Sequence, residues 1–220
     1  PDIQFVADYQ TKDSEQIMVK VGISAISTSN AMENLNAEIP NWNFENIKNK
    51  GKTLWNKELA KFEVEGSKEQ KETFYTAAYH AFMSPTNYFD VDRTYRGLDQ
   101  NIHTAEDFDN YTVFSLWDTY RATHPLFCLT QADRNANMIQ SMLKHYEQSP
   151  DNLLPIWSFW NNETWCMIGY HAVPVIVDAY FKGVQGIDWE LAYQACIHSA
   201  THPEYDATQE YENLGYVPYD

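Results

Sequence analysis

Apolar side chains recur at helical spacing in several separate stretches, and this pattern predicts a mainly α-helical chain. The stretches expected to be helical are residues 29–39, 44–62, 71–83, 111–124, 132–148, 163–181 and 189–199. Pro40, Pro85 and Pro125 follow or close three of them, as expected for a residue that cannot continue a helix. Pro174 lies inside the sixth stretch, where we expect a kink or an interruption.

The start and the end of the chain follow other patterns. Residues 16–23 alternate in a β-rich segment, and Ile3 to Val6 is a candidate partner strand. Because a lone hairpin is marginal in water, we expect a larger sheet around these residues. Near the other end, residues 211–218 are expected to form an extended or turn segment.

Composition limits the classes of function. In 220 residues, a hydrophobic content of 44% with 15% aromatics is enough for a substantial core. The net charge of -16 argues against a polyanionic partner such as nucleic acid. No apolar run is long enough for a membrane span. The three cysteines are odd in number and widely spaced, so we expect buried free thiols.

Motifs for nucleotide binding and for serine hydrolases are missing, since the chain contains no GxGxxG, Walker or GxSxG pattern. Two pairs have a helical spacing, His124 with Cys128, which Pro125 interrupts, and His198 with His202. We expect a core thiol and a polar helix end there, and metal ligation is the less favoured alternative. Residues 87–110 form an aspartate-rich loop whose spacing is not that of an EF-hand. Solvated turn residues are therefore the alternative to calcium ligation there.

One carboxylate, Glu163, stands among three tryptophans, namely Trp157, Trp160 and Trp165. Asn161 or Asn162 is expected to cap a helix that begins there, which would place Glu163 in the first turn beside unpaired main-chain N–H groups. An acid among aromatic faces suits a sugar, because pyranose C–H faces stack on indoles and the acid can protonate a glycosidic oxygen. The alternative is a helix-dipole role for Glu163 with the tryptophans in the core.

A second group of polar and aromatic residues lies at Trp117, Asp118, Tyr120 and Arg121. Asp118 and Arg121 are one helical turn apart, so they suit a surface ion pair. Beside the two aromatic side chains, the same pair is equally suited to bind sugar hydroxyls. The sequence leaves both interpretations open.

Several motifs in one order resemble glycoside hydrolase family 92, the calcium-dependent, inverting exo-α-mannosidases. The two that carry most of the resemblance are Tyr111-Thr-Val-Phe-Ser-Leu-Trp-Asp-Thr-Tyr-Arg121, followed by His124-Pro125-Leu126, and Asn162-Glu-Thr-Trp-Cys-Met-Ile-Gly-Tyr-His171. Further similarity lies at residues 21–24, 74–80, 178–180 and 214–218, so the resemblance covers nearly the whole chain.

The resemblance implies an N-terminal β-sandwich joined by linker helices to an (α/α)6 toroid. Residues 1–28 would be the last strands of the sandwich, 29–66 the linker helices and 67–220 the first part of the toroid. Twelve helices with their loops need roughly 200 residues beyond the linker, so the toroid is not expected to close within this chain. We therefore expect an internal fragment that is inactive alone and whose partner is the remainder of the same enzyme.

The resemblance also assigns roles. Glu163 matches the general acid, whereas the general base would lie outside the chain. The residues expected to contact the substrate are Trp117, Asp118, Arg121, Trp157, Asn162 and Thr164. Calcium, with ligands that the sequence does not identify, would hold the mannose hydroxyls. The expected protein is secreted or periplasmic and removes terminal α-mannose, with α-1,2 linkages favoured. The rival interpretation is a non-catalytic helical carbohydrate-binding or interaction module.

Overall fold

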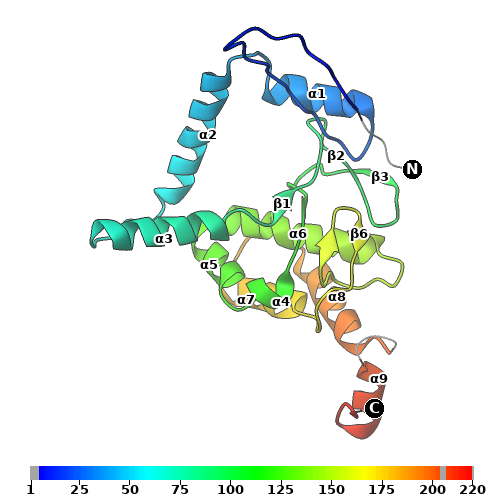
Figure 1. The fold of residues 1–220 in the computed structure, drawn as a ribbon. Coiled ribbons are helices and arrows are strands. Elements are labelled where there is room, and N and C mark those ends of the chain that lie inside the picture. Colours follow the sequence, from blue (N-terminus) through cyan, green and yellow to red (C-terminus); the bar gives the residue numbers. More distant parts are fainter. Residues whose placement is uncertain (1–4, 204–206, 220) are drawn as a thin grey trace.

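The structure, a computed structural model, describes residues 5–203 and 207–219, and over these ranges the chain is mainly α-helical, as predicted (Figure 1). Three helices come first: α1 (Thr28–Glu38), α2 (Phe44–Leu59) and α3 (Lys68–Ala81). Ser27 and Asn43 cap α1 and α2 by accepting main-chain N–H groups, and Ser67 forms a capping box at α3. These helices confirm the predicted stretches at 29–39, 44–62 and 71–83.

The predicted strand at residues 16–23 does not form. Within the described residues this segment pairs with no strand, while Ile3 and Gln4 of its expected partner lie outside them. Val19, Val21 and Ile23 each expose more than 70% of their surface. An alternating pattern becomes a strand only where another strand accepts its hydrogen bonds, and the described residues offer none here.

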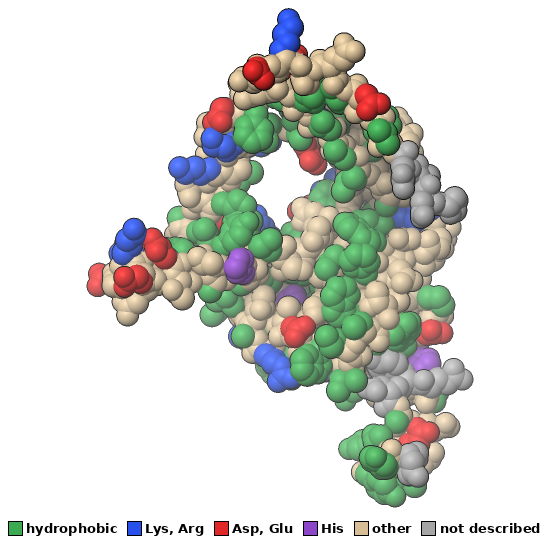
Figure 2. Space-filling model, viewed as in Figure 1, with side chains coloured by type: hydrophobic (Ala, Val, Ile, Leu, Met, Phe, Trp, Pro, Cys, Tyr) green, Lys and Arg blue, Asp and Glu red, His purple; other side chains and the backbone are tan. Residues whose placement is uncertain are grey.

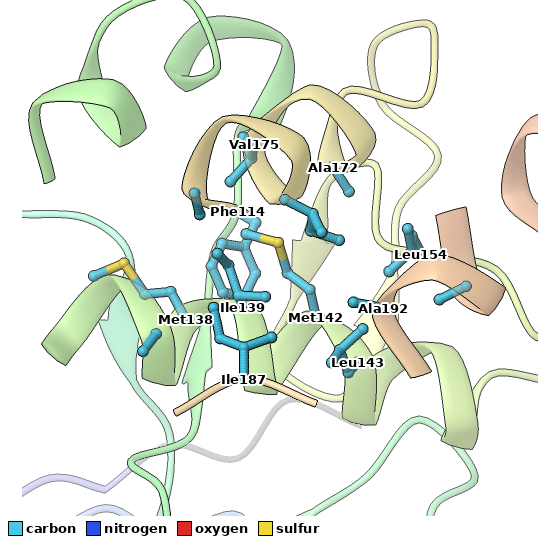
Figure 3. Close-up of a cluster of buried hydrophobic side chains, with 14 of the residues drawn as sticks. Phe114, Met138, Ile139, Met142, Leu143, Leu154, Ala172, Val175, Ile187 and Ala192 are labelled. Carbon is cyan, nitrogen blue, oxygen red and sulfur yellow. The ribbon is translucent and has the colours of Figure 1, made fainter. Parts of the chain in front are cut away.

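The core is built around α6 (Ala132–Gln148), whose bounds agree with the prediction. It packs against α5 (Thr123–Thr130) and α8 (Trp189–Thr201), and α5 and α8 both contact α7 (Ala172–Phe181). Figure 3 shows side chains of α6 meeting those of α7, α8 and the chain before α4. Those buried completely or nearly so include Phe114, Ile139, Met142, Leu143, Ala172 and Val175.

Residues 111–124 were predicted as one helix, which is wrong. They contain β4 (Tyr111–Thr112), the short α4 (Leu116–Thr119) and the start of α5. Val113 has a φ of 64°, which interrupts regular helix between them. Pro125 lies in the first turn of α5, where its missing N–H is not needed, so it begins a helix where a helix end was predicted.

The same reason applies to Pro174. It lies in the first turn of α7, so the predicted helix over 163–181 begins only at Ala172 and is not kinked at the proline. The tail prediction is wrong in part, since α9 (Thr208–Leu214) is helical and ends at Gly215 with a φ of 76°. Of the cysteines, Cys196 is buried and Cys128 half-buried, but Cys166 is exposed, contrary to expectation.

Short strands shape the loops that surround α6. β1 (Thr86–Asn87) pairs with β4, and β2 (Thr94–Arg96) pairs with β3 (Ile102–Thr104) inside the aspartate-rich loop. β5 (Ser158–Phe159) and β6 (Asn162–Glu163) form a tight hairpin. All three pairs are antiparallel, and none joins another pair into a larger sheet among the described residues.

An ionic contact attaches α2 to the core. Glu58 lies 2.8 Å from both Lys61 and Arg134, and Gln131 donates a hydrogen bond to it. Burial alone would raise the pKa of Glu58, but the hydrogen bonds from Lys61 and Gln131 and the nearby charges lower it to about 2.

Figure 2 shows an opening between the arm of α1 and α2 and the rest of the molecule. No helix of the described residues combines the length and apolar character that crossing a bilayer requires.

Candidate active site

Glu163 lies in a β-hairpin and not in the first turn of a helix, so the predicted placement is wrong. Phe159 and Asn162 pair across β5 and β6, which leaves Trp160 and Asn161 as a two-residue turn. Trp160 has a φ of 57°, and asparagine is common in such turns. The side chain of Asn161 donates to Gln100 instead of capping a helix. The asparagines that suggested a helix cap therefore belong to a hairpin turn and its flank.

The carboxylate of Glu163 holds the main chain on both sides of the hairpin. Its Oε1 accepts N–H groups of Trp157 and Trp165, both at 3.0 Å, and its Oε2 accepts that of Ile156 at 3.0 Å. The side chain is only 7% exposed. Each oxygen is thus committed to main-chain donors, which is the arrangement of an anchor for the loop.

His145 of α6 lies beneath this anchor, with its Nε2 3.5 Å from Oε2 of Glu163. Burial lowers the pKa of His145 to about 3, so the imidazole is neutral near neutral pH. The contact is therefore between a carboxyl group and a neutral ring. A cavity of about 190 Å³ opens beside it and is lined in part by Asn162, Glu163 and Trp165.

Trp157 connects the hairpin to the other motif. Its carbonyl oxygen accepts the hydroxyl of Thr164 at 2.8 Å, which explains the position of Thr164. Its indole N–H donates to Ser115 Oγ at 2.8 Å, and that hydroxyl donates to Asp118 Oδ2 at 2.5 Å. Two motifs about 40 residues apart in the sequence are joined in this way.

The predicted group at Trp117, Asp118 and Arg121 lies on an exposed surface at α4. The guanidinium of Arg121 stacks over the rings of Trp117 and Tyr120, at 4.9 and 5.0 Å from their centres. Of the ion pairs recorded among the described residues, none joins Asp118 to Arg121, so the surface ion-pair interpretation is wrong. The ring of Tyr120 lies 4.6 Å from that of His171, a second contact between the two motifs.

The three tryptophans do not enclose Glu163 as an aromatic box. Trp157 and Trp165 reach the carboxylate through main-chain N–H groups. Trp160 packs with Tyr88, at 5.5 Å between ring centres, and its carbonyl oxygen accepts a hydrogen bond from the hydroxyl of Thr112. The ring of Trp165 is half exposed at 50%. A second, half-buried aromatic surface that suits a sugar lies around Trp117 and Tyr120.

No calcium ligand set is identified in the described part of the chain, where no three His, Cys, Asp or Glu side chains converge. In the aspartate-rich loop, Asp109 pairs with Arg93, and Asp90 accepts hydrogen bonds from Ser24 and Asn34. Asp99 lies 3.0 Å from His103. These carboxylates hold the loop and α1 together.

The residues of the two pairs considered for metal ligation contact other groups. His124 contacts Asn135, whose amide also donates to Cys128. His198 contacts the carbonyl of Asn152 and lies ring to ring with His202. Both arrangements agree with the expected core thiol and polar helix end.

The sequence pattern described as the glycosyl hydrolase family 92 catalytic domain matches residues 30–220 of this chain. The chain belongs to glycoside hydrolase family 92. Its fold is also similar to that of solved members of this family. One is a family GH92 alpha-mannosidase from Bacteroides thetaiotaomicron, 52% identical with a TM-score of 0.87 over 90% of this chain and 27% of that one. The same relative has been solved in complex with mannoimidazole.

Two further relatives extend the comparison. A family GH92 inverting mannosidase from Bacteroides thetaiotaomicron VPI-5482 is 34% identical, with a TM-score of 0.80 over 89% of this chain and 28% of that one. An uncharacterized secreted glycosidase from Arthroderma benhamiae is 26% identical over 92% of this chain and 23% of its own length. This family 92 chain therefore spans only about a quarter of the length of these relatives.

Two residues of the site were missed by sequence reasoning. Ser115 was not identified as a site residue, although its position three residues before Asp118 is a spacing at which a hydroxyl reaches a carboxylate at a helix start. His145 is one polar residue on the buried face of a long helix, and no local signal marks its contact with Glu163.

Proposed function

We propose that the protein containing this family 92 chain is an exo-acting α-mannosidase that hydrolyses terminal α-mannosides, α-1,2 linkages first, with inversion. Family membership supports this proposal, as do the descriptions of two relatives as an alpha-mannosidase and an inverting mannosidase. The observation that carries it within this chain is the series of contacts from Thr164 through Trp157 and Ser115 to Asp118, which connects the two family motifs.

The surface at α4 has the chemistry that a mannose ring requires. Asp118 is exposed and accepts hydrogen bonds, so its carboxylate suits vicinal sugar hydroxyls. Trp117 offers an aromatic face for the C–H groups of the ring. Arg121 is exposed beside it and brings further N–H donors.

Proton donation is proposed for Glu163 on the resemblance to the family. Both of its oxygens accept main-chain N–H groups, so donation to a leaving oxygen requires the carboxyl to give up at least one of these bonds. A general base outside this chain would activate water, since inverting enzymes place their two carboxyls roughly 6.5–9.5 Å apart across the scissile bond. The competing role for Glu163 is that of a loop anchor alone.

The remaining parts of the proposal concern the whole protein. Calcium would hold the sugar hydroxyls, and the remainder of the polypeptide would complete the site. A secreted or periplasmic location is proposed, because glycan substrates are found there and one relative is named a secreted glycosidase. Mannose-ending N-glycans would be the partners.

The decisive experiment assays the full-length gene product on linkage-defined mannobioses, with and without a chelator. We expect release of mannose, fastest from the α-1,2 isomer, with the anomeric configuration inverted by NMR and activity lost on chelation. A folded protein that hydrolyses no α-mannoside would overturn the proposal. Binding of mannobiose without hydrolysis would support the alternative of a non-catalytic carbohydrate-binding module.

A further inference from the structure

Ser115 lies between a donor and an acceptor whose chemistry fixes the direction of its hydroxyl hydrogen. The indole N–H of Trp157 points at Ser115 Oγ over 2.8 Å, and an indole nitrogen only donates. The hydroxyl of Ser115 has one hydrogen to donate, and its Oγ lies 2.5 Å from Asp118 Oδ2. The hydroxyl therefore accepts from Trp157 and donates to Asp118.

The donor end of this chain of hydrogen bonds is held rigidly. The main chain of Trp157 is fixed on both sides, with its N–H bound by Glu163 at 3.0 Å and its carbonyl by the Thr164 hydroxyl at 2.8 Å. Trp157 itself is half-buried, so the indole N–H is presented to Ser115 in one orientation. The hairpin thus sets the orientation of a hydroxyl that belongs to the start of α4.

The acceptor end is exposed. Asp118 is an exposed residue, and its Oδ2 is the oxygen that accepts the hydrogen bond from Ser115. A hydrogen bond to one carboxylate oxygen restricts rotation about the terminal bond of the aspartate and turns the other oxygen to a defined side. For a sugar ligand, such pre-orientation lowers the entropy that is lost on binding.

We propose that Ser115 is a positioning residue that orients Asp118 for a sugar hydroxyl and that receives its own orientation from Trp157. The proposal rests on the proposed function, in which Asp118 binds the mannose ring. Ser115 itself neither touches the sugar nor takes part in bond cleavage. Its effect therefore passes through Asp118, and this dependence is measurable.

The test is a double-mutant cycle in the full-length gene product, on α-1,2-mannobiose, with thermal unfolding of each variant as a check on folding. Ser115→Ala should lower kcat/KM about tenfold, mainly through KM, since it removes a hydrogen bond to a charged group. Ser115→Thr keeps the hydroxyl and should recover most of the activity. Trp157→Phe removes the donor and should give part of the loss. In an Asp118→Asn background, Ser115→Ala should have little further effect.

Ser84→Ala is the matched control. Its hydroxyl donates to the carbonyl of Val113 at 3.1 Å, so the variant loses one serine hydrogen bond in the same region without touching Asp118. We expect wild-type kinetics for it.

Two results would overturn the role of Ser115 while leaving the mannosidase proposal intact. One is an equal loss from Ser115→Ala in the wild-type and Asp118→Asn backgrounds. The other is wild-type kinetics of a folded Ser115→Ala variant. If the folded wild-type protein binds mannobiose without cleaving it, the double-mutant cycle compares the Kd of each variant for mannobiose in place of kcat/KM. A wild type that neither binds nor cleaves mannobiose overturns both proposals.

Discussion

The main-chain N–H of Trp157 donates to Oε1 of Glu163 over 3.0 Å, inside a carboxylate site that also takes the N–H of Ile156 on Oε2. Glu163→Gln disturbs this site, because an amide has one oxygen and its NH2 group then faces a main-chain donor. We expect the variant to lose about 1–3 kcal/mol of unfolding free energy. Urea unfolding measures this, and Glu147→Gln, in an exposed pair with Lys144, is the control and should change little. Unchanged stability in Glu163→Gln would contradict the anchoring role.

The leaving group separates the anchoring role of Glu163 from proton donation. If Glu163 donates the proton, the full-length Glu163→Gln variant loses most of its activity on mannobiose and much less on an aryl mannoside, whose leaving group needs little protonation. Steady-state kinetics on both substrates measure the difference. Equal losses on the two would assign Glu163 to loop anchoring and place the acid elsewhere.

The surface at α4 predicts two distinct kinetic effects. Trp117→Ala removes the aromatic face and the stacking partner of Arg121, so kcat/KM should fall about tenfold. Asp118→Asn keeps the shape but weakens an acceptor, so affinity or rate should fall while the melting temperature stays close to that of wild type. Trp42→Ala, at an exposed tryptophan ahead of α2, is the matched control. Wild-type kinetics for both site variants would leave these residues with structural roles only.

Two buried histidines predict a pH dependence of stability. Burial lowers the pKa of His124 to about 4, with the hydrogen bond to Asn135 opposing the shift, and it lowers the pKa of His145 to about 3. In the unfolded chain both rings take up protons below about pH 6.5, whereas the folded chain does not until much lower pH. The contribution to stability is therefore complete above about pH 6.5 and decreases as the pH falls, by roughly 1.4 kcal/mol per pH unit for each ring.

Urea unfolding at pH 7.5, 6.5 and 5.5 checks this slope. His124→Gln should reduce it, because one of the two rings no longer titrates on unfolding. His80→Gln, at an exposed position on α3, serves as the control and should keep the wild-type slope. A slope that is the same in both variants would contradict the assignment to His124.

The elements predicted well are those whose pattern is long and regular. The stretch 132–148 carries four turns of apolar residues, and α6 has these bounds. The mispredicted segments contain residue types that occur in two different structural settings, so that the residue alone does not decide between them. Pro125 was predicted to close a helix and Pro174 to interrupt one, but both stand in first turns. An asparagine likewise suits a helix cap as well as a hairpin turn.

The contacts among the residues proposed for the site could not be predicted from the sequence. Asp118, Trp157 and Thr164 were identified from motifs, and the structure brings them together. The connecting hydroxyl of Ser115 belongs to one motif and its donor, Trp157, lies five residues before the other, so no local pattern reveals the contact. The strand predicted at 16–23 failed for a related reason, since its formation depends on a partner that the local sequence does not specify.

The three hydrogen bonds that Glu163 accepts at 3.0 Å all come from main-chain N–H groups, which every residue type except proline supplies. These three hydrogen bonds therefore depend on the side chain at position 163 and on the main chain at positions 156, 157 and 165. Trp165, half exposed at the edge of the loop, binds the carboxylate through its main-chain N–H, so this hydrogen bond does not itself require an indole. Evolution or design can in this way vary the chemistry at the rim of the hairpin without having to build a new loop.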